Sequence, residues 1–176
     1  YYDHNVLGAL ERVGDHRPPG DGHGPRQRFW TIRARQVVLA TGALERPLVF
    51  ADNDRPGVML ASAVRAYVNG YAVAPGRRMV VATNNDDAYR TALDAQAAGI
   101  DVAAVVDCRE RPGPLAERAR AAGIPVRTRT VVRRVRGGIE LRGVELAAPD
   151  GTLLEALACD LVAVSGGWNP AVHLSS

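Results

Sequence analysis

Lysine is absent from this chain of 176 residues, and all 22 of its basic residues are arginine. Aromatic residues make up only 5% of the sequence, and the formal net charge is +3. A nucleic-acid surface needs clustered basic residues with aromatic or helical presentation. The densest basic run alternates in part with apolar residues, as a strand with one solvated face does. We therefore expect no nucleic-acid partner. That run consists of Arg127, Arg129, Arg133, Arg134 and Arg136.

Cysteines and long apolar runs are also scarce. Cys108 and Cys159 lie far apart and outside any Cys-x-x-Cys pair, which argues against a disulfide scaffold and against a redox-active dithiol. No apolar run is long enough to cross a bilayer, and the amino-terminal residues lack the basic and apolar regions of a secretion signal. These features predict a cytoplasmic protein with no membrane partner.

A glycine- and proline-rich loop over residues 14–25 contains Asp15, His16, Asp21 and His23. A flexible loop offers a metal ion neither fixed geometry nor supporting hydrogen bonds. We predict no metal site there. Strands are expected on either side of the loop, over 5–13 and 27–32.

The most informative stretch is the apolar run 36–43, which contains Ala-Thr-Gly. A continuous apolar run is typical of a buried parallel strand, and glycine beyond its carboxyl end lets the backbone approach a ligand. Open α/β sheets bind ligands at that end. Residues 40–42 are therefore candidates for a cofactor site. The alternative is an ordinary buried strand that ends in a glycine turn.

After Pro47 the pattern predicts a fresh βαβ unit, which continues into the first half of a doubly wound sheet. Ser62 is placed to cap a short helix. Strands are expected over 79–82, 102–106 and 126–132, with one helix over 86–98 and another that starts at Pro114 and ends before Gly123.

The phosphate loop of this unit departs from the Gly-x-Gly-x-x-Gly/Ala pattern, because the aligned residues are Thr83, Asn85 and Ala88. Asp86 and Asp87 stand where phosphates would bind and are expected to cap the helix. Asp107 takes the place of the acid that holds a ribose, and we interpret it as a remnant. The unit is thus expected to keep the fold without the nucleotide site.

A second apolar strand, 159–165, is followed by Gly-Gly-Trp. Two such strands around a βαβ unit predict a nested arrangement, in which the chain leaves one dinucleotide-binding domain, builds a second and returns. We expect the end of the first domain at 1–47, an inserted Rossmann-like domain at 48–164 and the return crossing at 165–176. Trp168 is either a cofactor contact or a hydrophobic contact with the first domain.

Five stretches carry a resemblance that spans essentially the whole chain: 2–5, Val37–Pro47, Asn53–Val64, Thr83–Asp86 and Ser165–Pro170. Together they are similar to the alpha subunit of heterotetrameric sarcosine oxidase. The resemblance implies an α/β fold of the nested, pyridine nucleotide-disulfide oxidoreductase type, with a parallel sheet and β hairpins. The large subunits of opine and amino-acid dehydrogenases share this architecture and stay an alternative.

The resemblance also implies a longer parent chain, of which this is an internal segment. In that family the alpha subunit carries NAD, FMN lies at its contact with the beta subunit, and FAD in the beta subunit accepts the hydride from sarcosine. Gamma and delta subunits complete the heterotetramer, and tetrahydrofolate is a co-substrate. The products are glycine, hydrogen peroxide, and formaldehyde or methylenetetrahydrofolate.

Carried onto this chain, the resemblance implies cofactor holding and subunit organisation, with no catalytic residue. A cofactor-free scaffolding module is the alternative, and the altered phosphate loop favours it for residues 48–160. A reductase that depends on FAD and NADH is disfavoured, because it needs an intact second loop and often a cysteine pair. The residues expected to line the NAD site are Ala40, Thr41 and Gly42, followed by Gly166, Gly167 and Trp168.

Overall fold

The computed structural model describes residues 4–18 and 24–173. Tyr2 and Asp3, from the stretch 2–5, and Asp21 and His23 of the glycine- and proline-rich loop lie outside these residues. The chain separates into unit 1, Tyr1–Gly42 with Pro170–Ser176, and unit 2, Ala43–Asn169. The functional division at 47/48 and 164/165 stays a prediction.

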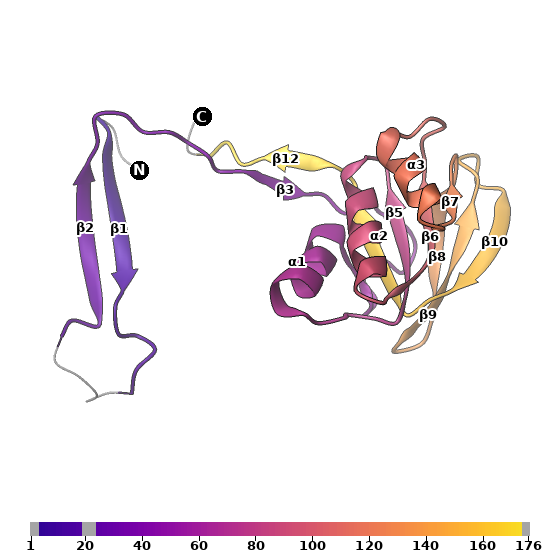
Figure 1. Cartoon of the computed structure of the whole chain (residues 1–176), viewed down its shortest axis with the longest axis horizontal. Helices are drawn as coiled ribbons and strands as arrows, with labels where there is room; N and C mark the ends of the chain where they lie inside the picture. The colour runs from indigo at the N-terminus through magenta and orange to yellow at the C-terminus, as the bar shows by residue number, and fades with distance from the viewer. Residues whose placement is uncertain (1–3, 19–23, 174–176) are drawn as a thin grey trace. The chain divides into compact units, whose positions relative to one another are not determined.

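Unit 1 contains an antiparallel hairpin of strands β1 (Val6–Arg12) and β2 (Gln27–Arg33), as predicted (Figure 1). Leu10 of β1 lies opposite Phe29 of β2, and both side chains are exposed. β2 is exposed along its whole length. The hairpin therefore buries little apolar surface among the described residues.

The expected buried strand over 36–40 is absent, and this prediction was wrong. Residues 36–42 have no regular secondary structure, and Val38 is 88% exposed. A buried parallel strand needs a hydrogen-bonded neighbour and a covered face. Neither is supplied to this segment within 4–18 and 24–173, so its apolar pattern alone does not make it a strand.

Unit 2 is built on a five-stranded sheet in the order β4-β11-β5-β6-β7, and every neighbouring pair is parallel. The interior strands are apolar runs because both faces of the sheet are covered. The strands are β4 (Val58–Leu60), β5 (Arg78–Thr83), β6 (Asp101–Asp107), β7 (Val126–Arg127) and β11 (Leu161–Ser165).

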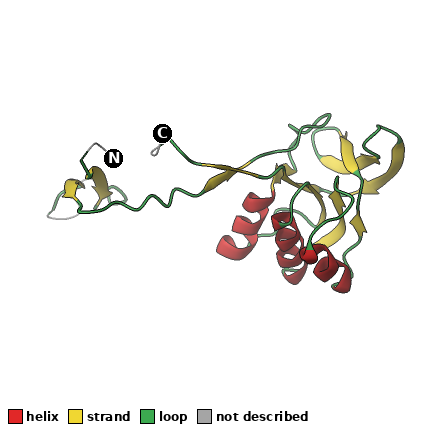
Figure 2. Cartoon of the chain, turned by 90° about the horizontal axis from the view of Figure 1, so that it is seen from above, coloured by secondary structure: helices red, strands yellow, loops and turns green. Residues whose placement is uncertain are grey.

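Helices α1 (Ala61–Tyr71), α2 (Asp87–Ala97) and α3 (Pro114–Ala121) cover one face of the sheet (Figure 2). Small residues let them pack closely, and Tyr89 of α2 is fully buried in this core. The expected capping by Ser62 was wrong. Helix α1 begins at Ala61, and the Ser62 N–H donates to the Glu45 carboxylate instead (2.8 Å).

A second sheet covers the opposite face, in the antiparallel order β10-β9-β8. Its strands are β8 (Val131–Gly137), β9 (Leu141–Ala147) and β10 (Leu153–Ala158). The single strand expected over 126–132 is divided, because the chain turns between β7 and β8 at Arg129, which has a φ of 50°. Valine and leucine side chains from both sheets form this second core.

The arginine-rich run does lie on a solvated face. Arg134 pairs with Asp52, and Arg133 and Arg136 both pair with Glu145. Each of these arginine side chains is about half exposed. Neighbouring carboxylates therefore offset the positive charge of the strand.

Two short strands enter and leave unit 2 side by side, β3 (Ala43–Glu45) and β12 (Trp168–Pro170) (Figure 1). The Arg46 N–H donates to Gly167 O (2.8 Å), and the Gly166 N–H donates to Arg46 O (2.7 Å). The predicted α/β class, with a parallel sheet and hairpins, is confirmed. Among the described residues no helix combines the length and apolar character needed to span a bilayer.

Candidate functional site

The carboxyl ends of the three central strands bring polar residues together at one edge of the parallel sheet. Thr83 ends β5, Asp107 ends β6 and Ser165 ends β11, and all three are buried. Ligands of open α/β sheets bind at this edge. It is therefore the first place in unit 2 to test for a nucleotide site.

Asn85 fills the place of the second glycine in the phosphate loop. Its amide nitrogen donates to Ser165 Oγ (2.9 Å), and its Oδ1 accepts from the Asp87 N–H (3.1 Å). The Asn85 N–H itself donates to Thr83 Oγ1 (3.0 Å). Asp86 is the N-cap residue of α2, as predicted, but its side chain makes no capping hydrogen bond, and the Asn85 side chain accepts from the first turn instead. The backbone N–H groups of Asn85 and Asp87 thus donate to the protein's own side-chain oxygens.

Arg109 binds the buried carboxylate of Asp107. Its N–H and Nε donate to Asp107 Oδ1 (2.9 and 3.0 Å), and its Nη2 donates to Oδ2 (2.8 Å). The Tyr89 hydroxyl also donates to Oδ2 (2.9 Å). Asp107 is fully buried, so the protein itself satisfies this acid.

The same guanidinium reaches a second carboxylate. Arg109 Nη2 donates to Asp86 Oδ1 (2.7 Å), which also accepts from the Gly113 N–H ahead of α3 (3.1 Å). A Cβ on Gly113 would lie 1.7 Å from Asp86 Oδ2. Arg109 and Asp86 therefore join the end of β6 to the starts of α2 and α3. We call Asp86, Tyr89, Asp107 and Arg109 the Arg109 cluster.

The hydrogen bonds of the Arg109 cluster shift the pKa values of three of its members, Asp86, Tyr89 and Arg109. The hydrogen bond from Arg109 lowers the pKa of Asp86, burial opposes it, and the Gly113 N–H adds to the lowering. The hydrogen bonds to Asp107 raise the pKa of Arg109. Burial and then the hydrogen bond to Asp107 raise the pKa of Tyr89, so it stays a protonated donor at neutral pH.

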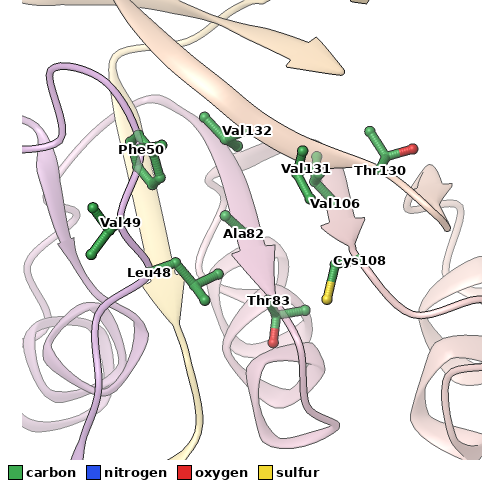
Figure 3. Close-up of a pocket in the computed structure, with 10 residues that line it drawn as sticks. All are labelled: Leu48, Val49, Phe50, Ala82, Thr83, Val106, Cys108, Thr130, Val131 and Val132. Carbon is green, nitrogen blue, oxygen red and sulfur yellow. The ribbon is translucent and has the colours of Figure 1, made fainter. Parts of the chain in front are cut away.

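An apolar cavity of about 160 Å³ lies on the face opposite the helices (Figure 3). Thr83 and Cys108 lie at one end, and Phe50 and Val132 at the other. Its two threonine hydroxyls already donate to backbone oxygens, of Asn85 and Thr128. The cavity thus offers mainly apolar contact, which suits a small apolar group rather than a dinucleotide.

The first group of predicted site residues lies in unit 1 and is exposed. The Thr41 hydroxyl donates to Ala171 O, and the Ala171 N–H donates to Gly42 O (2.9 Å). Gly42 has a φ of 70°, and a Cβ there would meet nothing within 4 Å. The backbone of Gly42 thus has open space on the side where another residue would carry its Cβ, and Ala40 and Thr41 next to it are exposed.

The second group lies in unit 2, where its two glycines serve close packing. A Cβ on Gly166 would lie 2.7 Å from Pro47 O, and one on Gly167 would lie 3.2 Å from Arg46 Nη2. Arg46 Nη2 and Asn84 Nδ2 both donate to Gly166 O (3.1 and 3.3 Å). Trp168 is 40% exposed.

Two arginines matter at these sites that sequence reasoning did not select. Arg109 could have been noticed because it follows Asp107 by two residues and precedes a Pro-Gly-Pro turn. Its hydrogen bond to Asp86 could not be predicted from the neighbouring sequence, since the two residues are far apart in the chain. Arg46 lies within a recognised motif, but its contacts with Gly166 and Gly167 depend on the pairing of β3 with β12.

No protein-family model matches the chain. Solved structures define its class by fold. The thioredoxin reductase of T. acidophilum aligns over 83% of this chain and 49% of its own, with a TM-score of 0.61 and 16% identity. The L-proline dehydrogenase of P. horikoshii aligns over 82% and 24%, with a TM-score of 0.56 and 24% identity. The chain has an α/β fold that resembles the FAD- and NAD-binding domains of pyridine nucleotide-disulfide oxidoreductases.

Curated relatives show which longer protein the chain resembles in sequence. The chain is 45% identical over 181 residues to sarcosine oxidase subunit alpha of Rhizobium meliloti (strain 1021), which covers 99% of this chain and 17% of the relative. It is 47% identical over 182 residues to the same subunit of Corynebacterium sp. (strain P-1), covering 99% and 19%. The chain is homologous over its whole length to one segment of the sarcosine oxidase alpha subunit, and spans less than a fifth of those relatives.

Proposed function

We propose that this chain is a segment of the alpha subunit of a multisubunit sarcosine oxidase and that it holds NAD and organises subunits rather than carrying out catalysis. The observation that carries the proposal is the identity of 44–47% along 99% of the chain to three sarcosine oxidase alpha subunits. The reaction is the oxidative demethylation of sarcosine to glycine. Hydrogen peroxide forms with it, together with formaldehyde or methylenetetrahydrofolate.

The proposed NAD contacts differ in how well the local geometry supports them. Ala40, Thr41 and Gly42 have the stronger support, because they are exposed and Gly42 leaves its Cβ side open. Gly166 and Gly167 have weaker support, since they are packed against Arg46 and Pro47. Trp168 is 40% exposed, so it is accessible to a cofactor.

The remaining parts of the proposed assembly lie outside this chain. FMN is shared with the beta subunit, FAD is held in the beta subunit, and gamma and delta subunits complete a cytoplasmic heterotetramer. Tetrahydrofolate acts as co-substrate of the complex. The role of unit 2 in this assembly is structural, and the Arg109 cluster supports that part of the proposal.

The test uses the purified full-length complex. It is denatured, and the released nucleotides are identified subunit by subunit by chromatography and mass spectrometry. We expect NAD from the alpha subunit and flavins from the beta subunit or from its contact with alpha. FAD alone in the alpha subunit would instead favour the large subunit of an opine or amino-acid dehydrogenase. No nucleotide at all would favour a scaffolding module.

A matched pair of variants tests the placement of NAD. Gly42→Ala adds a Cβ beside the proposed cofactor at a φ of 70°, and Gly151→Ala adds one in a surface turn at a φ of 90°. Both positions have open space around the new atom, so the backbone strain is similar. We expect several-fold lower NAD occupancy for Gly42→Ala only. Equal occupancy in both variants would contradict this placement.

A further inference from the structure

We propose that the parallel sheet of unit 2 binds no dinucleotide, because the Arg109 guanidinium lies at its carboxyl edge. There it donates to the carboxylate oxygens that a nucleotide would need as acceptors. The fold resembles dinucleotide-binding domains, yet the residues at the carboxyl edge do not fit such a ligand. The proposal concerns unit 2 alone. It holds whether or not residues 40–42 contact NAD in the complete enzyme.

The ribose position is the first point of conflict. A dinucleotide-binding sheet presents an acid after its second strand to the ribose hydroxyl. Asp107 has that place, but its two oxygens already accept four hydrogen bonds, three from Arg109 and one from Tyr89. A carboxylate has about four acceptor sites. Asp107 is also fully buried, so it has neither capacity nor access for a ribose hydroxyl.

The phosphate position is the second point of conflict. A pyrophosphate binds to free N–H groups at the start of a helix. Here the Asn85 and Asp87 N–H groups donate to side-chain oxygens of the same loop. The Asp86 carboxylate lies beside them and fills the space over Gly113, where even a Cβ would come within 1.7 Å. A phosphate would have to displace an anion that is held by Arg109 and Gly113.

The charge of the Arg109 cluster also disfavours a bound pyrophosphate. Arg109 supplies one positive charge between the two carboxylates of Asp86 and Asp107, which leaves one net negative charge at this edge. Asp87 next to it is shared by Arg65 and Arg90, at longer distances of 3.8 and 3.7 Å. An approaching pyrophosphate would therefore be repelled where a nucleotide-binding loop attracts it.

Hydrogen exchange of the full-length wild-type complex provides the primary test. Amide exchange over residues 83–113 is measured with the complex's own cofactors only and again with millimolar NAD, NADP or FAD added. We expect no change in this segment. Protection of residues 83–88 or of Gly113 by any of the three nucleotides would overturn the proposal, and this measurement requires no variant to fold.

Substitutions then test Arg109 as the positioning residue. Arg109→Gln removes the guanidinium, and Arg111→Gln is the matched control, because Arg111 is exposed and has no ion pair within residues 4–18 and 24–173. We expect Arg109→Gln to accelerate exchange at least tenfold around Gly113 and the start of α2, with the released nucleotides unchanged. Exchange as slow as in Arg111→Gln, or loss of a bound nucleotide, would overturn the proposal.

Asp107→Asn separates this proposal from the function proposed above. The variant keeps the size of the side chain but removes the charge that a ribose-binding acid supplies. We expect the NAD content of the complex to equal that of the wild type. If NAD is absent from the wild-type alpha subunit, the proposed function fails while the present proposal stands. If NAD is present and falls with Asp107→Asn, the present proposal fails.

Discussion

At the scale of single residues, the Arg109 guanidinium connects the end of one strand to the start of a helix by hydrogen bonds. Arg109 reaches Asp107 at the end of β6 and Asp86 at the start of α2, with distances of 2.7–3.0 Å. Removing one partner of a buried pair leaves an uncompensated charge, which costs about 3–5 kcal/mol. Asp107 is the partner that would bear this cost, because it alone is fully buried. Arg109 is therefore a stability determinant of unit 2.

The pKa of Asp86 gives this cluster a defined pH dependence. Because the hydrogen bond from Arg109 holds the folded-state pKa of Asp86 below its ordinary value, the ionised carboxyl stabilises the fold above that ordinary value. The contribution is lost as the pH falls through the folded pKa. We expect Asp86→Asn to be less stable than wild type by up to about 1 kcal/mol at pH 7, a value kept small because the side chain is 38% exposed. Denaturant unfolding at pH 7, 5 and 3 measures the difference.

Glu110→Gln is the control for this prediction. Glu110 is exposed in the loop between β6 and α3, which also carries Arg109, and has no ion pair or hydrogen bond in the described part of the chain. Its substitution should leave stability unchanged at all three pH values. A stability difference between wild type and Asp86→Asn that stays constant down to pH 3 would contradict the assigned role of the Asp86 charge.

At the scale of elements, the sequence predicts those structures whose partners are close in the chain. The βαβ unit from β5 to β6 was predicted because its apolar runs and its helix are consecutive. The segment 36–40 was mispredicted because burial depends on neighbours that its own residues do not encode. The strands β9 and β10 were missed, since their pairing with β8 is a property of the sheet. The Arg109 cluster depends on the same assembly and could not be predicted from one segment.

Two glycines in helical surroundings provide a test of how α3 begins. Gly113→Ala places a Cβ 1.7 Å from the Asp86 carboxylate and forces that group away from Arg109. We expect a loss of about 1–3 kcal/mol, as for overpacked cores. Gly70→Ala lies within α1 with open space around it and should gain about 0.5–1 kcal/mol. Thermal and urea unfolding compare the two variants with wild type.

The opposite signs are the essential part of this prediction. Both substitutions add a single methyl group to a glycine without a positive φ. If Gly113→Ala were neutral, Asp86 would not be held at the start of α3. A destabilising Gly70→Ala would mean that the solvent-exposed side of α1 makes contacts beyond those within unit 2.

At the scale of the whole molecule, the two units differ in how they bury apolar residues. Unit 2 has a core on each face of its parallel sheet. Unit 1 has a two-stranded hairpin whose Phe29 and Trp30 are 67% and 47% exposed. A two-stranded hairpin by itself is marginally stable in water, and its free edges favour association with other strands. Unit 1 is therefore the less stable part of this chain.

Trypsin tests this difference, because it cleaves after arginine and both units contain arginines. We expect early cleavage within residues 12–35 and survival of a fragment close to Ala43–Asn169. Mass spectrometry of a digestion time course identifies the fragments. A digest in urea serves as the control and should remove the difference in rate. Equally rapid loss of both units in native buffer would contradict the two-unit description.

The position of β11 has a consequence for biosynthesis. It is the last strand of the parallel sheet to leave the ribosome, yet it lies between β4 and β5 and pairs Val162 with both Val58 and Val80. Until residues 161–165 emerge, β4 has no partner in the sheet and one edge of β5 is unpaired. Such long-range pairing slows folding. The nascent chain therefore carries an unpaired edge on β5 through most of the synthesis of unit 2, and unpaired strand edges favour association with other chains.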